Sequence, residues 1–127
     1  MKFLIDTQIL IWYYEGNATL PDKAKAAISK PDNQRFVSMA SLWEMAIKVS
    51  IGKLSLSRTL PDFFTQIFGE DISILPISAN HALEIITLPH HHKDPFDRLI
   101  IAQAIVEDLE IITSDTQFKD YPVKLLL

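Results

Sequence analysis

Short apolar runs alternate with longer segments of helical pattern along the whole chain. This alternation is typical of a parallel sheet whose strands are joined by helices packed on its faces. We expect strands at residues 2–5, 35–38, 72–75 and 110–113, with a fifth strand at the sheet edge at 123–126. We expect helices at residues 7–14, 21–29, 41–51, 61–68, 78–87 and 95–107, and a short one at 116–118. The prediction is one α/β domain over residues 1–127, with a central, mostly parallel sheet of four to five strands and helices on both faces.

Composition narrows the class of protein. Hydrophobic residues make up 48% of 127 residues, which excludes a disordered chain and permits a substantial core. The chain has no cysteine, so disulfides and thiolate metal sites are excluded. No segment approaches the roughly 20 apolar residues that span a bilayer, and Asp6 interrupts the apolar start too early for a signal peptide. We therefore expect a cytoplasmic protein with no membrane association.

The formal net charge of −4 limits how nucleic acid could be bound. Proteins that hold nucleic acid through phosphate contacts alone tend to be basic. A nucleic-acid ligand would therefore need bound cations, a local basic patch, or both.

Four acidic residues stand where predicted strands end or helices begin. Asp6 and Asp115 directly follow apolar strands, Glu44 lies early in the third helix, and Asp97 is at the third position of the last long helix. Functional groups in open α/β sheets collect beyond the carboxyl ends of the strands. Each acid also has a structural alternative: Asp6 and Asp115 suit caps or turns, Ser41 with Glu44 matches a capping box, and Asp97 suits the helix dipole.

If the four acids lie together at one sheet edge, their separate structural roles no longer account for them. Two carboxylates about 4 Å apart repel by about 4 kcal/mol at an effective dielectric constant near 20. Four of them in one cleft require raised pKa values or bound cations. Oxygen ligands without cysteine favour Mg²⁺ or Mn²⁺ over Zn²⁺. Such a cation suits phosphodiester hydrolysis, because it lowers the pKa of a bound water and offsets phosphate charge.

Taken together and in order, the motifs resemble those of the PIN-domain family over nearly the whole chain, and within it the VapC-type toxins of toxin–antitoxin pairs. The matching segments are Phe3-Leu4-Ile5-Asp6-Thr7, Ser41-Leu42-Trp43-Glu44-Met45-Ala46-Ile47-Lys48, Gly52-Lys53-Leu54, His92-Lys93-Asp94-Pro95-Phe96-Asp97-Arg98-Leu99-Ile100-Ile101-Ala102-Gln103-Ala104 and Thr113-Ser114-Asp115. The resemblance implies that the catalytic and metal-binding residues are Asp6, Glu44, Asp97 and Asp115, holding Mg²⁺ or Mn²⁺.

The resemblance also implies supporting residues and partners. Thr113 would support the last acid, and Asp94 could contribute to metal binding through water. Family members cleave RNA, are usually homodimers, and are silenced by an antitoxin whose C-terminal segment covers the active-site groove. The expected function is thus a Mg²⁺- or Mn²⁺-dependent endoribonuclease that acts as the toxin of a type II toxin–antitoxin system.

Several nearby residues have two interpretations. Lys48, Lys53 and Arg98 could contact RNA or the antitoxin. Lys48 also stands four residues after Glu44, as in an ordinary helical ion pair, and the other two suit solvated surface charge. The run from residue 90 to residue 92 is three histidines, which suggests a metal tract, but a loop with exposed histidines is the favoured interpretation.

Two rival functions fit part of the pattern. A non-catalytic PIN-like binding module would keep the fold without turnover, although a complete acidic quartet argues against it. A response-regulator receiver would need an acidic pair after the first strand, an aspartate after a middle strand and a lysine after the last. Val37-Ser38 carries no aspartate and Thr113-Ser114-Asp115 no lysine, so the receiver is disfavoured.

Overall fold

The computed structural model describes residues 1–127 and contains one five-stranded sheet in the order β3-β2-β1-β4-β5. All four neighbouring pairs are parallel. The strands are β1 (Lys2–Ile5), β2 (Gln34–Ser38), β3 (Ser73–Leu75), β4 (Glu110–Ile112) and β5 (Leu125–Leu126). This confirms the predicted α/β class and its parallel sheet.

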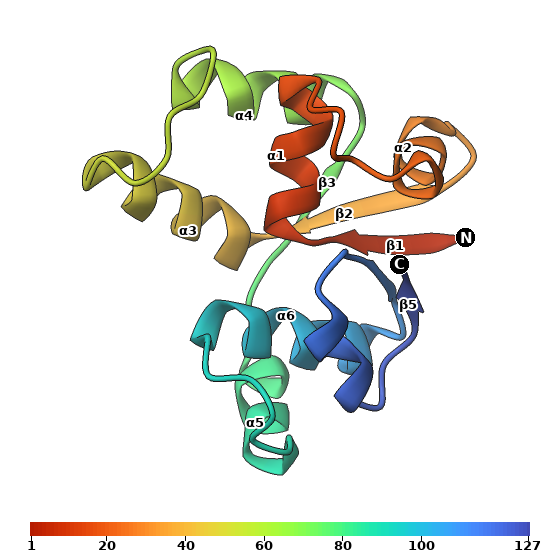
Figure 1. Cartoon of the computed structure of the whole chain (residues 1–127). Helices are drawn as coiled ribbons and strands as arrows, with labels where there is room; N and C mark the ends of the chain where they lie inside the picture. Colours follow the sequence, from red (N-terminus) through yellow and green to blue (C-terminus); the bar gives the residue numbers. More distant parts are fainter.

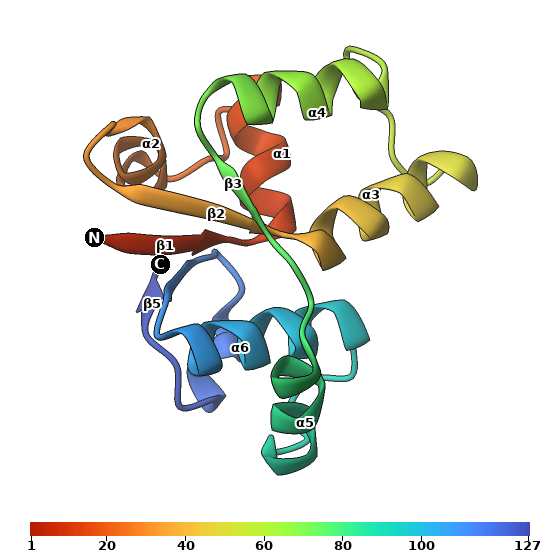
Figure 2. The ribbon, with the colours of Figure 1, turned by 180° about the vertical axis from the view of Figure 1, so that it is seen from behind.

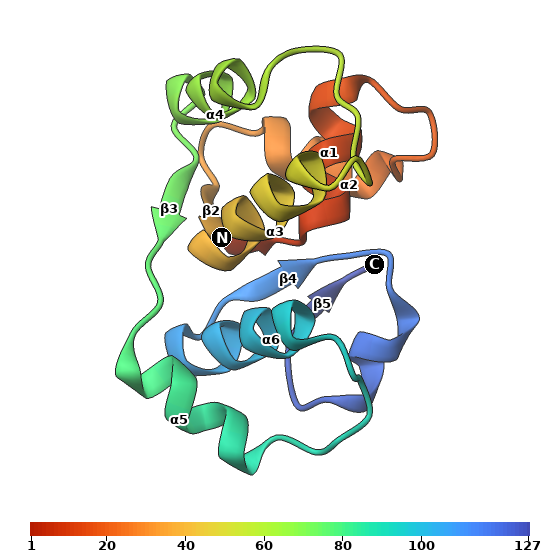
Figure 3. The ribbon, with the colours of Figure 1, turned by 90° about the vertical axis from the view of Figure 1, so that its left-hand side faces the viewer.

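Helices cover both faces of the sheet (Figure 1). They are α1 (Thr7–Glu15), α2 (Asp22–Ser29), α3 (Met39–Ser50), α4 (Leu60–Gly69), α5 (Ala79–Thr87) and α6 (Pro95–Glu107), with a 3₁₀ helix η1 (Thr116–Asp120). Figure 3 shows α1 to α4 on one side of the sheet, with α5 and α6 on the other. The view from behind shows β3 leading from α4 to α5, so it carries the chain across the sheet edge (Figure 2).

Side-chain alternation along β1 divides the core into two parts. Phe3 and Ile5 are buried among residues of α1 to α4, whereas Leu4 is buried in the second cluster with residues of α6 and β4. Successive side chains of a strand point to opposite faces, so an apolar run without alternation indicates a strand covered on both sides. This is why β1 has no polar residue after Lys2.

The strand order places a crevice at the centre of the sheet. The chain lays β2 and β3 on one side of β1, then returns to place β4 and β5 on the other. The direction reverses between β1 and β4, and ligands of open α/β sheets bind at such a switch point beyond the carboxyl ends of the strands. Receiver domains have the order 2-1-3-4-5. The observed order therefore excludes the receiver alternative.

The register brings the ends of the central strands level. Ile5 lies beside both Val37 of β2 and Ile112 of β4. The residues that follow these three therefore emerge at one edge of the sheet.

None of the helices has both the length and the apolar character needed to span a membrane.

Candidate functional site

Asp6 occupies the position directly after β1 and caps α1. Its Oδ1 accepts a hydrogen bond from the backbone amide of Thr7 at 2.8 Å, and its Oδ2 accepts one from Thr113 Oγ1 at 2.9 Å. The residue is only 7% exposed. Burial raises the pKa of Asp6 to about 6, the two hydrogen bonds oppose that rise, and the charges of Glu44 and Asp115 add to it. Asp6 does cap α1, but the cap does not offset the free-energy cost of burying its charge.

Thr113 joins the ends of the two strands that flank the switch point. While donating to Asp6, its Oγ1 also accepts a hydrogen bond from the backbone amide of Asp115 at 3.0 Å. A hydroxyl can donate once and accept at the same time. Thr113 thus fixes the orientation of the Asp6 carboxylate and the path of the chain into Asp115.

Glu44 lies in the second turn of α3, not in a capping box. The helix begins at Met39, and Ser38 caps it by accepting from the Ala40 amide at 3.0 Å. The expected cap at Ser41 is wrong, because the last residue of β2 already turns directly into the helix. Ser41 is buried instead, where its Oγ accepts from Thr7 Oγ1 at 2.7 Å.

One oxygen of Glu44 has no hydrogen-bond partner. Glu44 is 5% exposed; its Oε2 pairs with Lys48 Nζ at 2.9 Å, whereas its buried Oε1 is unsatisfied. The ion pair raises the pKa of Lys48, mainly through the hydrogen bond to Glu44. A buried carboxylate oxygen without a partner is costly. A divalent cation bound in the cleft would give this oxygen a partner.

Asp97 reaches the cleft from the first turn of α6. Asp94 caps this helix, its Oδ1 accepting from the amides of Phe96 at 2.8 Å and Asp97 at 3.3 Å. Burial, followed by the charges of Asp6 and Asp94, raises the pKa of Asp97 to about 7, and His92 opposes this rise. Asp94 therefore has a structural role that accounts for its hydrogen bonds, while Asp97 bears a charge that the metal-free protein disfavours.

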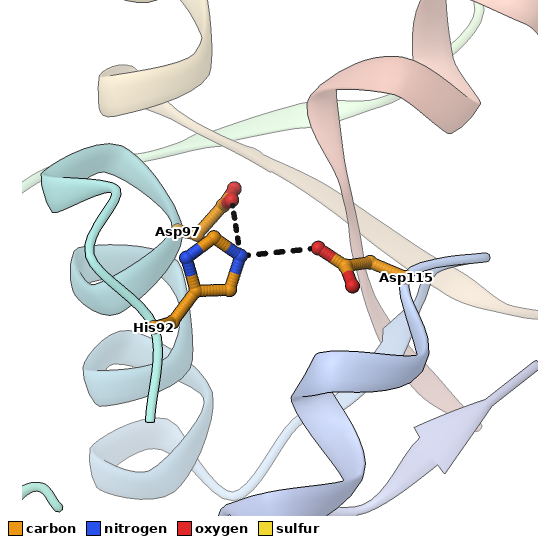
Figure 4. A group of neighbouring side chains, drawn as sticks. All are labelled: His92, Asp97 and Asp115. Atoms are coloured by element: carbon orange, nitrogen blue, oxygen red, sulfur yellow. Dashed lines mark hydrogen bonds and ion pairs between the residues drawn. The ribbon is translucent and has the colours of Figure 1, made fainter. Parts of the chain in front are cut away.

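His92 connects Asp97 with Asp115. Its Nε2 lies 3.0 Å from Asp97 Oδ2 and 3.1 Å from Asp115 Oδ2, as Figure 4 shows. The histidine side chain is 12% exposed, whereas His90 and His91 are exposed. The expected exposed loop is thus correct for two of the histidines and wrong for His92. Only the motif spacing placed this residue near the acids, because a loop has no periodic pattern to indicate its burial.

The four predicted acids line one cleft of about 270 Å³. Its lining consists of Asp6, Thr7, Gln8, Ile11, Glu44, Lys48, Asp94, Asp97, Ser114 and Asp115. Lys48 is the only basic side chain among them, and it is already paired with Glu44. Raised pKa values at two acids and an unsatisfied oxygen at a third fit a site for a divalent cation held by oxygen ligands.

A neighbouring groove of about 400 Å³ holds more of the basic residues. Lys48 lines both this groove and the acidic cleft. The other residues that line the groove are Glu44, Ile47, Ile51, Lys53, Lys93, Asp94, Pro95 and Phe96. Arg98 is different, because it is only 8% exposed. Its guanidinium donates to Pro89 O at 2.7 Å, to Ile85 O at 3.4 Å and to Tyr121 Oη at 3.4 Å.

Those contacts correct the expectation for Arg98. Solvated surface charge is excluded, because Arg98 is buried and donates to Pro89 O in the loop before His92, to Ile85 O of α5 and to Tyr121 Oη. A contact of Arg98 with RNA or the antitoxin stays a prediction. Arg98 directly follows Asp97, so the two side chains leave α6 about 100° apart around the helix axis. The sequence did not distinguish these two directions at the start of an otherwise apolar helix.

The fold and the site together define an α/β protein with an acidic cleft at the switch point of a parallel sheet. The PIN domain family model matches residues 3–124. This chain therefore belongs to the PIN-domain family. A sequence search of curated proteins finds no significant match.

Solved structures of similar fold come from toxin–antitoxin complexes. VapBC2 from Rickettsia felis, bound to a DNA fragment from the promoter, is 22% identical with a TM-score of 0.72, covering 99% of this chain and 98% of that one. A toxin–antitoxin complex from Klebsiella pneumoniae is 24% identical with a TM-score of 0.64 and coverages of 98% and 95%. VapBC-1 from nontypeable Haemophilus influenzae is 18% identical with a TM-score of 0.68 and coverages of 99% and 97%.

Proposed function

We propose that this protein is a Mg²⁺- or Mn²⁺-dependent endoribonuclease in which Asp6, Glu44, Asp97 and Asp115 hold the cation. One observation carries the proposal: the four carboxylates line a single cleft, and one of them has a buried oxygen with no partner. Membership of the PIN-domain family supports it, since PIN domains are generally nucleases.

The bound cation would supply a water of lowered pKa as the nucleophile and would offset charge on the scissile phosphate. Neighbouring residues of this chain position three of the four carboxylates. Thr113 and the Thr7 amide orient Asp6. Lys48 holds one oxygen of Glu44 and leaves the other unpartnered. Asp94 fixes the first turn of α6, from which Asp97 projects.

We propose further that the protein is the toxin of a type II toxin–antitoxin pair and binds a cognate antitoxin. The similar structures named above are complexes of this kind, which supports the proposal. The groove with Lys48 and Lys53 lies beside the acidic cleft and combines apolar and basic side chains, which suits either RNA or the antitoxin. Co-expression with the product of an adjacent short reading frame should yield a stable complex that does not cleave RNA.

A homodimer is also proposed. Leu83 and Ile86 of α5 are apolar yet 60% and 78% exposed. Neighbouring apolar side chains of this kind on a helix suit a protein–protein interface. Sedimentation velocity of the purified protein should give the mass of two chains, and a single-chain mass would contradict this part of the proposal.

The cleavage assay tests the main proposal. Purified protein should cut a mixed-sequence RNA in Mn²⁺ or Mg²⁺, and EDTA should stop it. Asp97→Asn should abolish cutting, whereas Asp32→Asn, a loop carboxylate outside the cleft, should leave it unchanged. Full activity of Asp97→Asn would overturn the site assignment. Tight Mn²⁺ binding without cleavage of any RNA would favour the non-catalytic binding module instead.

A further inference from the structure

The imidazole of His92 is held by hydrogen bonds at both nitrogens. Nδ1 lies 3.2 Å from the backbone amide of Asp94, which can only donate. Nδ1 must therefore present its lone pair, and a neutral ring then carries its proton on Nε2. That proton is donated to Asp115 Oδ2 at 3.1 Å, and Nε2 also lies 3.0 Å from Asp97 Oδ2 in an ion-pair contact. One tautomer satisfies both hydrogen bonds of the ring.

We propose that His92 is a positioning residue whose Nε2–H donates to Asp115 and lies against Asp97, and that it orients these two acids without binding the cation itself. This inference rests on the proposed function, because it concerns the same cation site. It assigns a role to a residue outside the acidic quartet.

The alternative is that His92 is itself a ligand. One ligand atom from each of His92, Asp97 and Asp115 lies within 4.8 Å of the others, which is compact enough to hold a metal ion. Coordination through Nε2 would require the proton to move to Nδ1. The Nδ1–H would then face the Asp94 N–H, donor against donor. Histidine ligands instead donate their second N–H to an acceptor. The backbone at Asp94 thus disfavours coordination and favours donation.

The position of the ring is fixed by the loop that carries it. Tyr121 Oη accepts from the amides of His91 at 3.1 Å and His92 at 2.7 Å. Arg98 anchors the same loop through Pro89 O, and the ring of Phe118 packs edge-on against His92 with centroids 5.9 Å apart. A side chain held this firmly can fix the direction of the carboxylates it contacts.

One histidine between the two acids meets a need of this cleft. Asp97 comes from α6 and Asp115 precedes η1, so no secondary structure connects them directly (Figure 4). The Nε2–H occupies Oδ2 of Asp115 and lies against Oδ2 of Asp97, which reduces the repulsion between the two carboxylates. Outer-shell partners of this kind typically contribute 10- to 100-fold to metal affinity.

Three variants test the role of His92. In His92→Gln the side-chain amide nitrogen reaches about as far as Nε2 and can still donate. In His92→Asn the amide reaches only about as far as Nδ1, so the donor to Asp115 and the contact with Asp97 are lost. His90→Asn is the matched control from the exposed part of the same loop. Isothermal titration with MnCl₂ should show Mn²⁺ affinity falling about 10- to 100-fold in His92→Asn. Most of that affinity should return in His92→Gln, and His90→Asn should match the wild type.

Two spectra separate positioning from coordination. Electron spin-echo modulation of the Mn²⁺-loaded wild type should lack the ¹⁴N coupling of a directly bound imidazole, and ¹⁵N shifts of the metal-free protein should report a proton on Nε2 of His92. A directly coupled ¹⁴N that disappears in His92→Asn would make His92 a ligand and overturn the inference. Wild-type affinity in His92→Asn would overturn it as well. In both cases the wild type binds Mn²⁺ and the proposed cation site stands. A wild type that binds no Mn²⁺ would instead overturn the proposed function, and this inference with it.

Discussion

Asparagine at position 97 should make the metal-free protein more stable while removing its activity. The pKa of Asp97 is raised from 3.8 to about 7, chiefly by burial and then by the charges of Asp6 and Asp94. At neutral pH the folded protein therefore carries a carboxylate that is more stable in the unfolded chain. Asparagine has nearly the same shape, carries no charge, and can still place its side-chain oxygen against His92.

The pH dependence follows from the direction of that change. Below pH 3.8 Asp97 is protonated in both states, so the substitution has little electrostatic effect. Between pH 3.8 and about 7 only the unfolded chain ionises, and above about 7 the penalty is complete. Three tenfold steps at about 1.4 kcal/mol each give roughly 4 kcal/mol. The side chain is 18% exposed, and solvent screening reduces the expected gain to about 2 kcal/mol.

Urea unfolding in EDTA measures this gain. At pH 8 the free energy of unfolding of Asp97→Asn should exceed that of the wild type by about 2 kcal/mol, and at pH 5 by less than half as much. Asp32→Asn should show no gain at either pH. Saturating Mn²⁺ should reverse the order, because a ligand that binds only the folded state stabilises it and the variant has lost a ligand. Equal or lower stability of Asp97→Asn at pH 8 in EDTA would refute the account of this carboxylate.

Other substitutions test the supporting contacts. Thr113→Val removes the donor to Asp6, so Mn²⁺ affinity measured by calorimetry should fall about 10- to 100-fold, and Thr113→Ser should retain most of it. Ser38→Ala removes the cap of α3 and the hydrogen bond that Ser38 Oγ donates to Gln103 Oε1. It should lower the free energy of unfolding in urea by about 2–4 kcal/mol; no change would contradict the role of these two contacts. Arg98→Met leaves Pro89 O without its donor and should cost about 1–3 kcal/mol, with faster amide hydrogen exchange at residues 90–92. Unchanged exchange there would show that Arg98 does not hold the loop.

The secondary structure was largely predictable because the central strands β1 and β4 are buried on both faces. Runs such as Phe3-Leu4-Ile5 have no polar residue, and glycine or proline marks several of the breaks between elements. Observed bounds differ from the expected ones mostly by one or two residues. The difference that changes the role of a residue lies at the start of α3, where Ser38 and Ser41 both fit a cap by pattern. The choice between them depends on where β2 ends, which is set by pairing with β1 and β3.

The acids could also be predicted, whereas their partners could not. Asp6 and Asp115 follow strands, so topology alone brings them together. His92 and Arg98 depend on the conformation of a loop held by Tyr121, a contact across about 30 residues of sequence. Local sequence carries no pattern for such a contact. For the same reason, the burial of Arg98 under this loop could not be predicted from the sequence.

One measurement tests the central claim most directly. Crystals soaked in MnCl₂ and measured near the manganese absorption edge should give an anomalous difference peak bounded by Asp6, Glu44, Asp97 and Asp115. The peak should lie within ligand distance of the Glu44 oxygen that has no protein partner, and crystals of Asp97→Asn should lose it. A cleft without a peak, or manganese bound elsewhere on the protein, would contradict the account.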